Sequence, residues 1–215
     1  VRWLEGAVRQ NPEDRRVRRL LARGYARQGR PGLATDTLET LIEQNPDHAA
    51  LRLEAAELHA RLGAMDMADR HLSALLNHAD MPPMIVVAAA ERLANHGRAE
   101  PAMERLAELH RRGELGDEGT RLYGRLLLET GRTGEALDLT REVLAGDPES
   151  PALWELVIET LDRTDQPRAA DRALQRMSEA GLPPVEAAVI RGNHLARTDD
   201  ATGALAAYRD ALALD

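Results

Sequence analysis

Hydrophobic positions in the stretch 117–150 follow the spacing of two amphipathic helices joined by a tight turn. Leu122, Leu126 and Leu127 recur at three- and four-residue spacing, which places them on one face of a helix. Gly131 then interrupts the pattern, and a second apolar face follows it. The stretch therefore predicts a helix-turn-helix unit.

The same pattern returns every 34 residues along the chain, without insertion or deletion. A fixed period of this length in helix-turn-helix form indicates a repeat array, in which each unit packs on its neighbours. We expect one array over 1–215, with a half repeat at 1–14 and units at 15–48, 49–82, 83–116, 117–150, 151–184 and 185–215. Because the first residues already match a second helix, we expect the chain to be a fragment of a longer array.

Two columns of residues define the register of the repeat. A glycine ends the first helix of the early units, at Gly29, Gly63, Gly97 and Gly131. Glycine suits this place because it adopts the left-handed conformation without a steric penalty. Asp165 and Asp199 hold the column in the last two units, where we expect looser turns. The second column is a small residue where helices must approach closely: Ala34, Ala68, Ala102, Ala136, Ala170 and Ala204.

This pattern resembles that of the tetratricopeptide repeat family over the whole chain. The family's motif residues in the first full unit are Leu21, Ala22, Tyr25, Gly29, Ala34, Leu38 and Pro46. Those in the fourth unit are Tyr123, Gly124, Leu127, Gly131, Ala136 and Pro148, and Trp154 fills the aromatic column of the fifth. The resemblance implies an all-α fold: a right-handed α-solenoid of helix pairs, whose first helices line a concave groove. It also implies a non-catalytic scaffold that binds a peptide segment or a protein partner.

Composition narrows the possible functions. The 215-residue chain has a net charge of −8 at pH 7, which argues against general nucleic-acid binding. It contains no Cys, so disulfides and thiolate metal sites are excluded. The longest apolar run, Met84–Ala90, is too short to span a bilayer. We therefore expect no membrane-spanning segment in this fragment.

Motifs for chemistry are missing from the sequence: it has no phosphate-binding loop, dinucleotide fingerprint or HExxH motif. The histidines are scattered, at His48, His59, His71, His78, His96, His110 and His194. We interpret His71 and His78 as solvated residues, because their spacing is too wide for one metal ion without further ligands. His59 shares a column with Tyr25, which predicts a packed, hydrogen-bonded core residue. We predict no catalytic residue, no metal site, no cofactor and no enzymatic activity.

Function is expected on the inward columns of the first helices, which the resemblance assigns to the groove. The candidate partner-binding residues are Arg16, Arg19, Arg23, Arg27, Glu54, Glu57, Arg61, Glu91, Asn95, Arg121, Arg125, Glu129, Glu155, Glu159, Arg163, Asn193 and Arg197. Arg121 and Arg125 lie one helical turn apart and are the sharpest candidates, because guanidinium groups suit carboxylate or phosphate recognition. The alternative is that both are solvated or pair with neighbouring Glu residues.

Chaperone-binding members of the family grip a C-terminal carboxylate with basic residues and Asn spread over three units. Arg19 and Arg23 match the first part of that set, but Glu54 stands where the middle Asn is expected. Its charge would repel the carboxylate of the ligand. The comparison excludes a chaperone clamp of this kind.

Basic residues crowd the start of the chain, at Arg9, Arg15, Arg16, Arg18, Arg19, Arg23, Arg27 and Arg30. Three interpretations stay open for them: a solvated face, a surface for an acidic protein or polymer, and a nucleic-acid surface. The negative total and the few aromatic residues disfavour nucleic acid.

The resemblance also leaves a second function class open, a periplasmic segment of a bacterial exopolysaccharide export or assembly protein. The sequence does not decide between cytoplasm and periplasm, and this analogy favours the periplasm. Leu205, Tyr208 and Leu212 keep the last helix apolar where an array normally ends in a polar cap. They predict self-association through the array ends.

Overall fold

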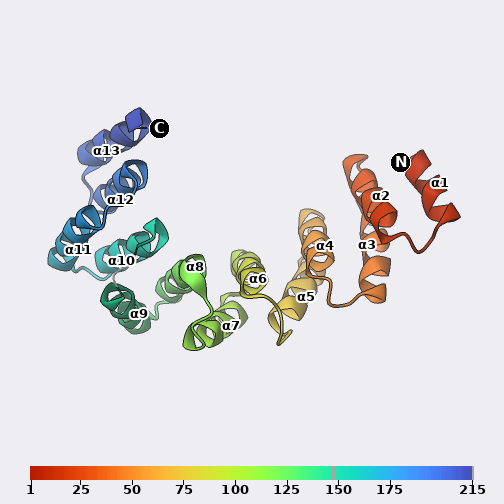
Figure 1. The fold of residues 1–215 in the computed structure, drawn as a ribbon, viewed down its shortest axis with the longest axis horizontal. Coiled ribbons are helices and arrows are strands. Elements are labelled where there is room, and N and C mark those ends of the chain that lie inside the picture. Colours follow the sequence, from red (N-terminus) through yellow and green to blue (C-terminus); the bar gives the residue numbers. More distant parts are fainter. Residues whose placement is uncertain (147–148, 215) are drawn as a thin grey trace. The chain divides into compact units, whose positions relative to one another are not determined.

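A computed structural model describes residues 1–146 and 149–214 of the chain. These residues form thirteen α-helices and no strand (Figure 1). The fold is an all-α solenoid of helical repeats, as the period predicted. Pro148 of the motif and Asp215 at the end of the last unit lie outside the described residues.

The chain divides into two compact units, Val1–Arg105 and Leu106–Asp215. The first contains α1 (Arg2–Gln10), α2 (Arg15–Arg27), α3 (Pro31–Gln44), α4 (Ala49–Arg61), α5 (Met65–Leu76) and α6 (Pro83–Asn95). Helix α7 (Ala99–Arg111) contains the boundary. The second contains α8 (Gly116–Glu129), α9 (Thr133–Ala145), α10 (Pro151–Arg163), α11 (Pro167–Glu179), α12 (Pro184–Arg197) and α13 (Ala201–Leu214).

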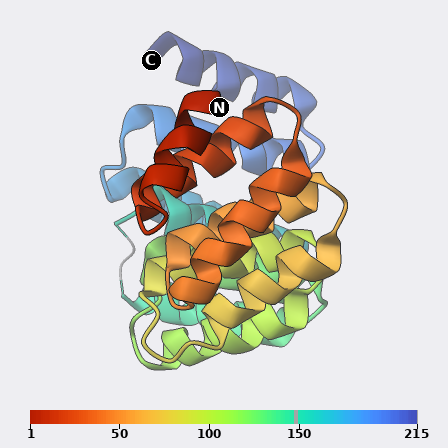
Figure 2. The same cartoon turned by 90° about the vertical axis from the view of Figure 1, so that its right-hand side faces the viewer.

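Neighbouring helices pack in chain order within each unit. In the first unit α2 packs on α3, α3 on α4, α4 on α5 and α5 on α6 (Figure 2). In the second unit α8 packs on α9 and α10, α10 packs on α11 and α12, and α12 packs on α13. The first helices of successive pairs therefore adjoin one another there. No helix in the described part of the chain is long and apolar enough to cross a membrane.

Turns within the helix pairs follow the predicted glycine column. Gly131 has a φ of 76°, and the next amide, of Arg132, donates to the carbonyl oxygen of Leu127 over 2.8 Å. Asp165 adopts the same left-handed conformation with a φ of 54°, and the Gln166 amide closes its turn over 2.9 Å. The looser turn expected at Asp165 is not seen in its hydrogen bonding, because the closing bond of 2.9 Å is close to the 2.8 Å at Gly131. The strain of a left-handed aspartate remains.

Small residues let the helices approach closely, as predicted. Ala34, Ala68, Ala102, Ala136 and Ala170 are completely buried, and Ala204 is 4% exposed. In the first helices, a Cβ added to Gly124 would lie only 2.2 Å from a methyl group of Leu156. Helix α8 can therefore approach α10 only because position 124 has no side chain.

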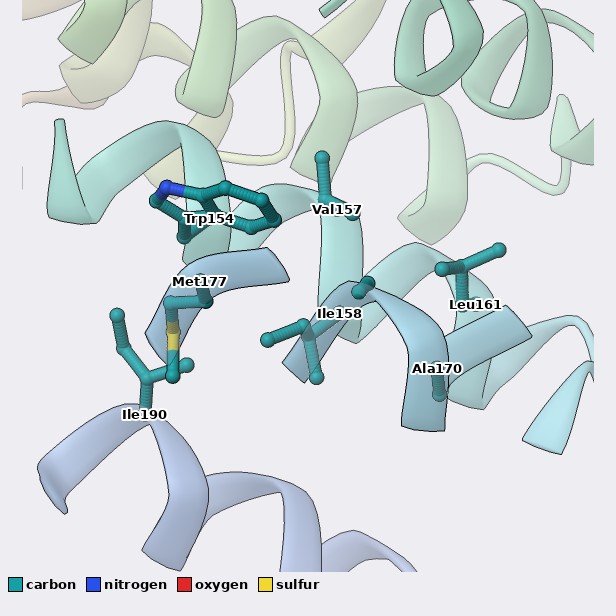
Figure 3. Packing of buried hydrophobic residues seen from close by; sticks show 8 residues of the cluster. Trp154, Val157, Ile158, Leu161, Ala170, Met177 and Ile190 are labelled. Atoms are coloured by element: carbon teal, nitrogen blue, oxygen red, sulfur yellow. The ribbon is translucent and has the colours of Figure 1, made fainter. Parts of the chain in front are cut away.

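Apolar side chains from three helices fill the core of the second unit. Trp154 and Ile158 of α10 pack with Met177 of α11 and Ile190 of α12 (Figure 3). Trp154 is 1% exposed, so the predicted aromatic column is occupied in this unit by a core residue. Helix α10 begins with the Ser150 hydroxyl accepting a hydrogen bond from the Leu153 amide, ahead of Pro at the first helical position.

Candidate functional site

The predicted partner-binding residues all lie on first helices and divide between the two units. Those in the first unit are Arg16, Arg19, Arg23, Arg27, Glu54, Glu57, Arg61, Glu91 and Asn95. Those in the second unit are Arg121, Arg125, Glu129, Glu155, Glu159, Arg163, Asn193 and Arg197.

Three of these residues form an ion cluster between α2 and α4. Arg19 binds Glu54 in a bidentate manner, with Nε 2.8 Å from Oε2 and Nη2 2.9 Å from Oε1. Arg23 donates to the same Oε1 from its Nε over 2.9 Å. Burial alone would raise the pKa of Glu54, but the hydrogen bonds and charges of Arg19 and Arg23 outweigh it and lower that pKa. The Glu54 carboxylate therefore stays ionised at neutral pH and neutralises part of the basic surface.

A concave pocket of about 190 Å³ lies beside this cluster. Its apolar lining comes from Ala22, Ala26, Leu38 and Leu58, and its polar lining from Arg23, Glu54, Glu57 and Arg61. Four predicted residues thus meet at one depression, which we call the α2/α4 pocket. The Arg61 guanidinium pairs with Glu57 one turn away on α4. An apolar floor with charged walls is suited to hold one hydrophobic side chain of an extended segment.

A second pocket, of about 370 Å³, lies along α8, α10 and α12. We call it the α8/α10/α12 pocket; its lining residues are Glu118, Arg121, Pro151, Ala152, Glu155, Val185, Glu186, Val189 and Ile190. It contains two predicted residues, Arg121 and Glu155. Arg121 pairs with Glu118 over 3.1 Å, as in the alternative interpretation of this arginine. Glu155 accepts a hydrogen bond from the Asn193 amide over 3.2 Å.

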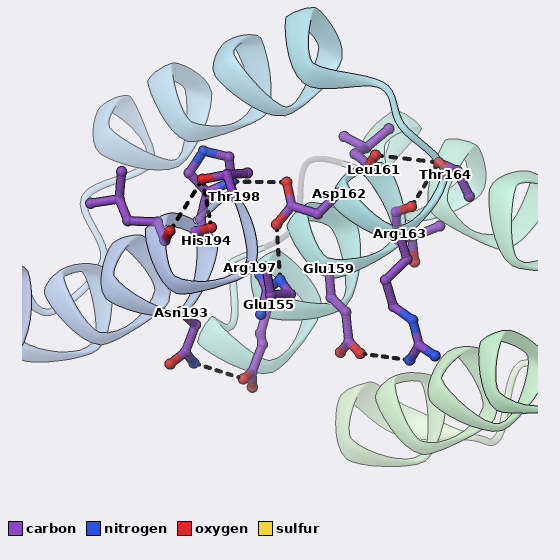
Figure 4. A network of polar contacts seen from close by, with 12 residues as sticks. Glu155, Glu159, Leu161, Asp162, Arg163, Thr164, Asn193, His194, Arg197 and Thr198 are labelled. Atoms are coloured by element: carbon purple, nitrogen blue, oxygen red, sulfur yellow. Dashed lines mark hydrogen bonds and ion pairs between the residues drawn. The ribbon is translucent and has the colours of Figure 1, made fainter. Parts of the chain in front are cut away.

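Arg197, a predicted residue of the second unit, belongs to a cluster that holds two helices together. Asp162 of α10 accepts from His194 Nδ1 over 2.8 Å and from Arg197 Nε over 2.9 Å, so both α12 residues are tied to α10 (Figure 4). Glu159 and Arg163 pair within α10 (Figure 4). This cluster stabilises the contact between neighbouring repeats and leaves Arg197 less available to a partner.

The other predicted residues lie outside these clusters. Arg125 lies 3.9 Å from Glu129 on the same helix, a wide ion pair. The exposed residues are Arg16, Arg27, Glu91 and Asn95. Of these, Arg27 lies one turn after Arg23 on α2, and extends the basic surface of that helix beyond the α2/α4 pocket.

Two histidines that looked unremarkable in the sequence share one carboxylate. The Nε2 atoms of His59 and His71 each lie 2.9 Å from Oε1 of Glu39. His59 is buried and hydrogen-bonded, which confirms its predicted place in the core. The interpretation of His71 as a solvated residue is wrong, because it is only 5% exposed. Burial lowers the pKa of His71, and Glu39 offsets this only in part, so its imidazole is neutral at pH 7.

Sequence reasoning missed these contacts because they do not follow the 34-residue period. Polar partners in neighbouring repeats recur at a separation of 32 residues, as in Glu39–His71, His110–Glu142 and Asp162–His194. The offset arises because the two side chains meet from staggered positions on adjacent units. A search for complementary side chains 32 apart would have found all three pairs.

The comparison with protein families matches the chain to the model of the tetratricopeptide repeat. The match covers residues 19–69 and 88–151, together more than half of the chain. A comparison with curated proteins found no match.

Solved structures share the fold at low sequence identity. A tetratricopeptide repeat protein from Parabacteroides merdae is 14% identical with a TM-score of 0.62, covering 98% of this chain and 84% of its own. The C-terminal part of a repeat protein from Cytophaga hutchinsonii is 15% identical with a TM-score of 0.64, and the match covers 100% of this chain and 88% of that one. YrrB, described as a repeat protein with an unusual peptide-binding site, is 16% identical with a TM-score of 0.56, covering 96% and 97%.

Proposed function

The chain belongs to the tetratricopeptide repeat family, whose fold serves protein–protein interaction, and we propose that it is a non-catalytic scaffold for an acidic peptide segment. The segment lies along α2 and α4 and places one apolar side chain in the α2/α4 pocket. We further propose that residues 1–215 act as a single repeat array. The observation that supports the binding site most directly is that an apolar floor lies beside helix α2, which carries six arginines and no acidic residue.

Charge determines the class of partner that we propose. Helix α2 carries six arginines and no acidic residue. Glu54 neutralises only part of this charge, because one carboxylate serves both Arg19 and Arg23. Arg27 is exposed next to the pocket. Guanidinium groups bind carboxylates with a favourable planar geometry, so a segment with Asp or Glu beside its apolar residue fits this surface best.

The experiment uses a fluorescent peptide in which one Leu is flanked by Asp and Glu, and measures its binding by polarisation. A peptide with Lys in place of each acidic residue serves as the comparison. We expect the acidic peptide to bind and the basic one to bind far more weakly. We also expect the affinity to fall with salt, because the interaction is largely electrostatic.

Two variants distinguish the contribution of the pocket to peptide binding from that of the arginine charge. Ala26→Trp fills the floor of the pocket and is expected to abolish binding, whereas Arg27→Glu reverses one charge beside it and is expected to weaken binding. Arg209→Glu reverses an exposed arginine on α13 and is the matched control for the second variant. Equal binding by the native chain and both pocket variants, with folding verified by circular dichroism, would refute the proposal.

Export or assembly of a bacterial exopolysaccharide in the periplasm stays a prediction from the resemblance.

Self-association through the last helix is a further proposal. Leu205 and Leu212 are 50% and 78% exposed on α13, which supports it, whereas the Tyr208 hydroxyl is already bound to Asn193 within the chain. The double variant Leu205→Glu, Leu212→Glu should shift an associating sample to monomer in light scattering. A native chain that is monomeric at high concentration would contradict self-association.

A further inference from the structure

Three consecutive helices of the first unit bring metal-ligating atoms to one point. Glu39 comes from α3, His59 from α4 and His71 from α5. One carboxylate oxygen and the two Nε2 atoms all lie within 4.8 Å of one another. The two imidazole rings stack with their centroids 5.5 Å apart and an interplanar angle of 15°. The Nε2 atom of His59 and the Nε2 atom of His71 both contact the same oxygen, Oε1 of Glu39.

Hydrogen bonding gives the His71 ring no other anchor in the described part of the chain. Its Nδ1 atom is buried without a hydrogen-bond partner there, and only Nε2 makes a polar contact. Such a ring is held by packing and by what it meets at Nε2. The contact at Nε2 is therefore the only polar contact of the ring there, and an ion bound at this atom would replace the hydrogen bond to Glu39.

We propose that Glu39, His59 and His71 form a binding site for one divalent transition-metal ion of the zinc type. Two imidazole nitrogens and one carboxylate oxygen form a common three-residue zinc set, with water in the fourth position. Imidazole ligands favour zinc, copper and nickel, whereas magnesium and calcium select oxygen ligands. The composition of the cluster thus selects the class of metal.

The two nitrogen–oxygen separations agree with such an ion, and the two nitrogens lie within 4.8 Å of each other. Tetrahedral ligands at zinc bond lengths stand about 3.3 Å apart. The two nitrogen–oxygen separations of 2.9 Å in the cluster are only slightly shorter. The Glu39 side chain is 31% exposed, so it is free to move outward by the few tenths of an ångström required. The same exposure admits the water ligand.

Metal binding here would link two helix pairs. Glu39 belongs to the α2/α3 pair, and both histidines belong to the α4/α5 pair. An ion that binds this arrangement, and not the unfolded chain, stabilises the folded state in proportion to its affinity. The ion therefore serves as a clip between neighbouring repeats, apart from the α2/α4 pocket proposed to bind the peptide.

The test measures zinc binding by titration calorimetry on chelator-treated protein, and the thermal midpoint with zinc or magnesium chloride. We expect one zinc ion per chain, a midpoint raised by zinc, and no response to magnesium. Glu39→Gln should weaken zinc binding by more than the roughly 10–100-fold that loss of an outer-shell partner costs. Being partly exposed, position 39 tolerates this isosteric change even if replacement of buried His71 unfolds the chain.

His110→Asn is the matched control, because His110 contacts one carboxylate, that of Glu142 at 3.0 Å, without a second imidazole. It should leave zinc binding unchanged. Imidazole nitrogen NMR shifts provide the independent measurement: zinc should move the Nε2 signals of two histidines, and Glu39→Gln should remove this response. Equal zinc affinity in the native chain and Glu39→Gln, or no zinc binding at all, would overturn the proposal.

Discussion

The two pockets lie on equivalent helices but differ in charge. The α2/α4 pocket has two arginines, Arg23 and Arg61, against two glutamates, Glu54 and Glu57, and adjoins a helix with six arginines. The α8/α10/α12 pocket carries three glutamates, Glu118, Glu155 and Glu186, against the single arginine Arg121. Both have apolar floors from small or branched side chains. The repeat thus determines where a depression forms, and the variable residues of the first helices determine what it attracts.

The two units share the same buried columns. Ala34 in the first unit and Ala136 in the second are both completely buried. Interior positions are fixed by close packing, which allows little change of volume. Positions on the exposed faces of the first helices meet no such constraint and are free to carry either charge. The comparison therefore separates a common scaffold from two different surfaces.

The largest expected effect is the loss of the aromatic core residue of the second unit. Trp154→Ala should reduce the free energy of unfolding by about 3–5 kcal/mol, because it opens a cavity at a fully buried site. Hydrogen exchange should show the loss of protection in α9 to α12, with α2 to α5 retained, since repeats are stabilised chiefly by their neighbours. Equal loss of protection in both groups of helices would contradict this local picture.

Overpacking the shared column tests whether the scaffold is the same in both units. Ala34→Leu and Ala136→Leu should each lower the free energy of unfolding by about 1–3 kcal/mol, because neither site has room for the added methyl groups. Chemical denaturation of the two variants provides the measurement. Ala26→Leu, at an exposed position on α2, is the control and should have little effect on stability. A large difference between the two buried sites would show that the units are packed differently.

Removing the carboxylate of Glu54 should increase the difference in charge between the two pockets. Glu54→Gln leaves Arg19 and Arg23 without an anionic partner, so the affinity for the acidic peptide should rise about tenfold, or about 1.4 kcal/mol. Polarisation with the same labelled peptide measures it. Glu155→Gln in the acidic pocket is the matched control and should leave that affinity unchanged. An unchanged or lower affinity for Glu54→Gln would mean that these arginines do not contact the peptide.

The smallest expected effect concerns the turns. Asp165→Gly should raise the free energy of unfolding by about 0.5–1 kcal/mol, because glycine removes the strain of a left-handed aspartate. Gly131→Asp, the reverse change at the equivalent turn, should lower it by a similar amount. The thermal midpoints of the two variants should move in opposite directions. A decrease for Asp165→Gly would show that the aspartate side chain makes a stabilising contact at its turn.

Much of the fold was predictable because it depends on positions where only one or two amino-acid types fit. A left-handed turn selects Gly131, and a close helix contact selects Ala136; both recur at the period and identify the repeat. Arg19, Arg23 and Glu54 were predicted to share a surface, and the structure brings them into one ion cluster.

The partners of charged side chains were much less predictable. Arg121 pairs with Glu118 on its own helix, a choice among several acidic neighbours that depends on side-chain rotamers. The convergence of Glu39, His59 and His71 depends on the stagger between adjacent units, which moves partners away from the 34-residue register. The repeat period predicts where the helices lie along the chain. Which side chains of neighbouring helices meet depends also on the angle between those helices, which the period does not give.

The most direct test of the proposed function maps the acidic peptide onto the chain by amide chemical shifts. The labelled protein is titrated with the peptide, and the shifted residues are assigned to helices. We expect shifts concentrated in α2 and α4, around Ala26, Glu57 and Arg61, which line the α2/α4 pocket. Shifts concentrated in α8, α10 and α12, or an unchanged spectrum at saturating peptide, would contradict the proposed function.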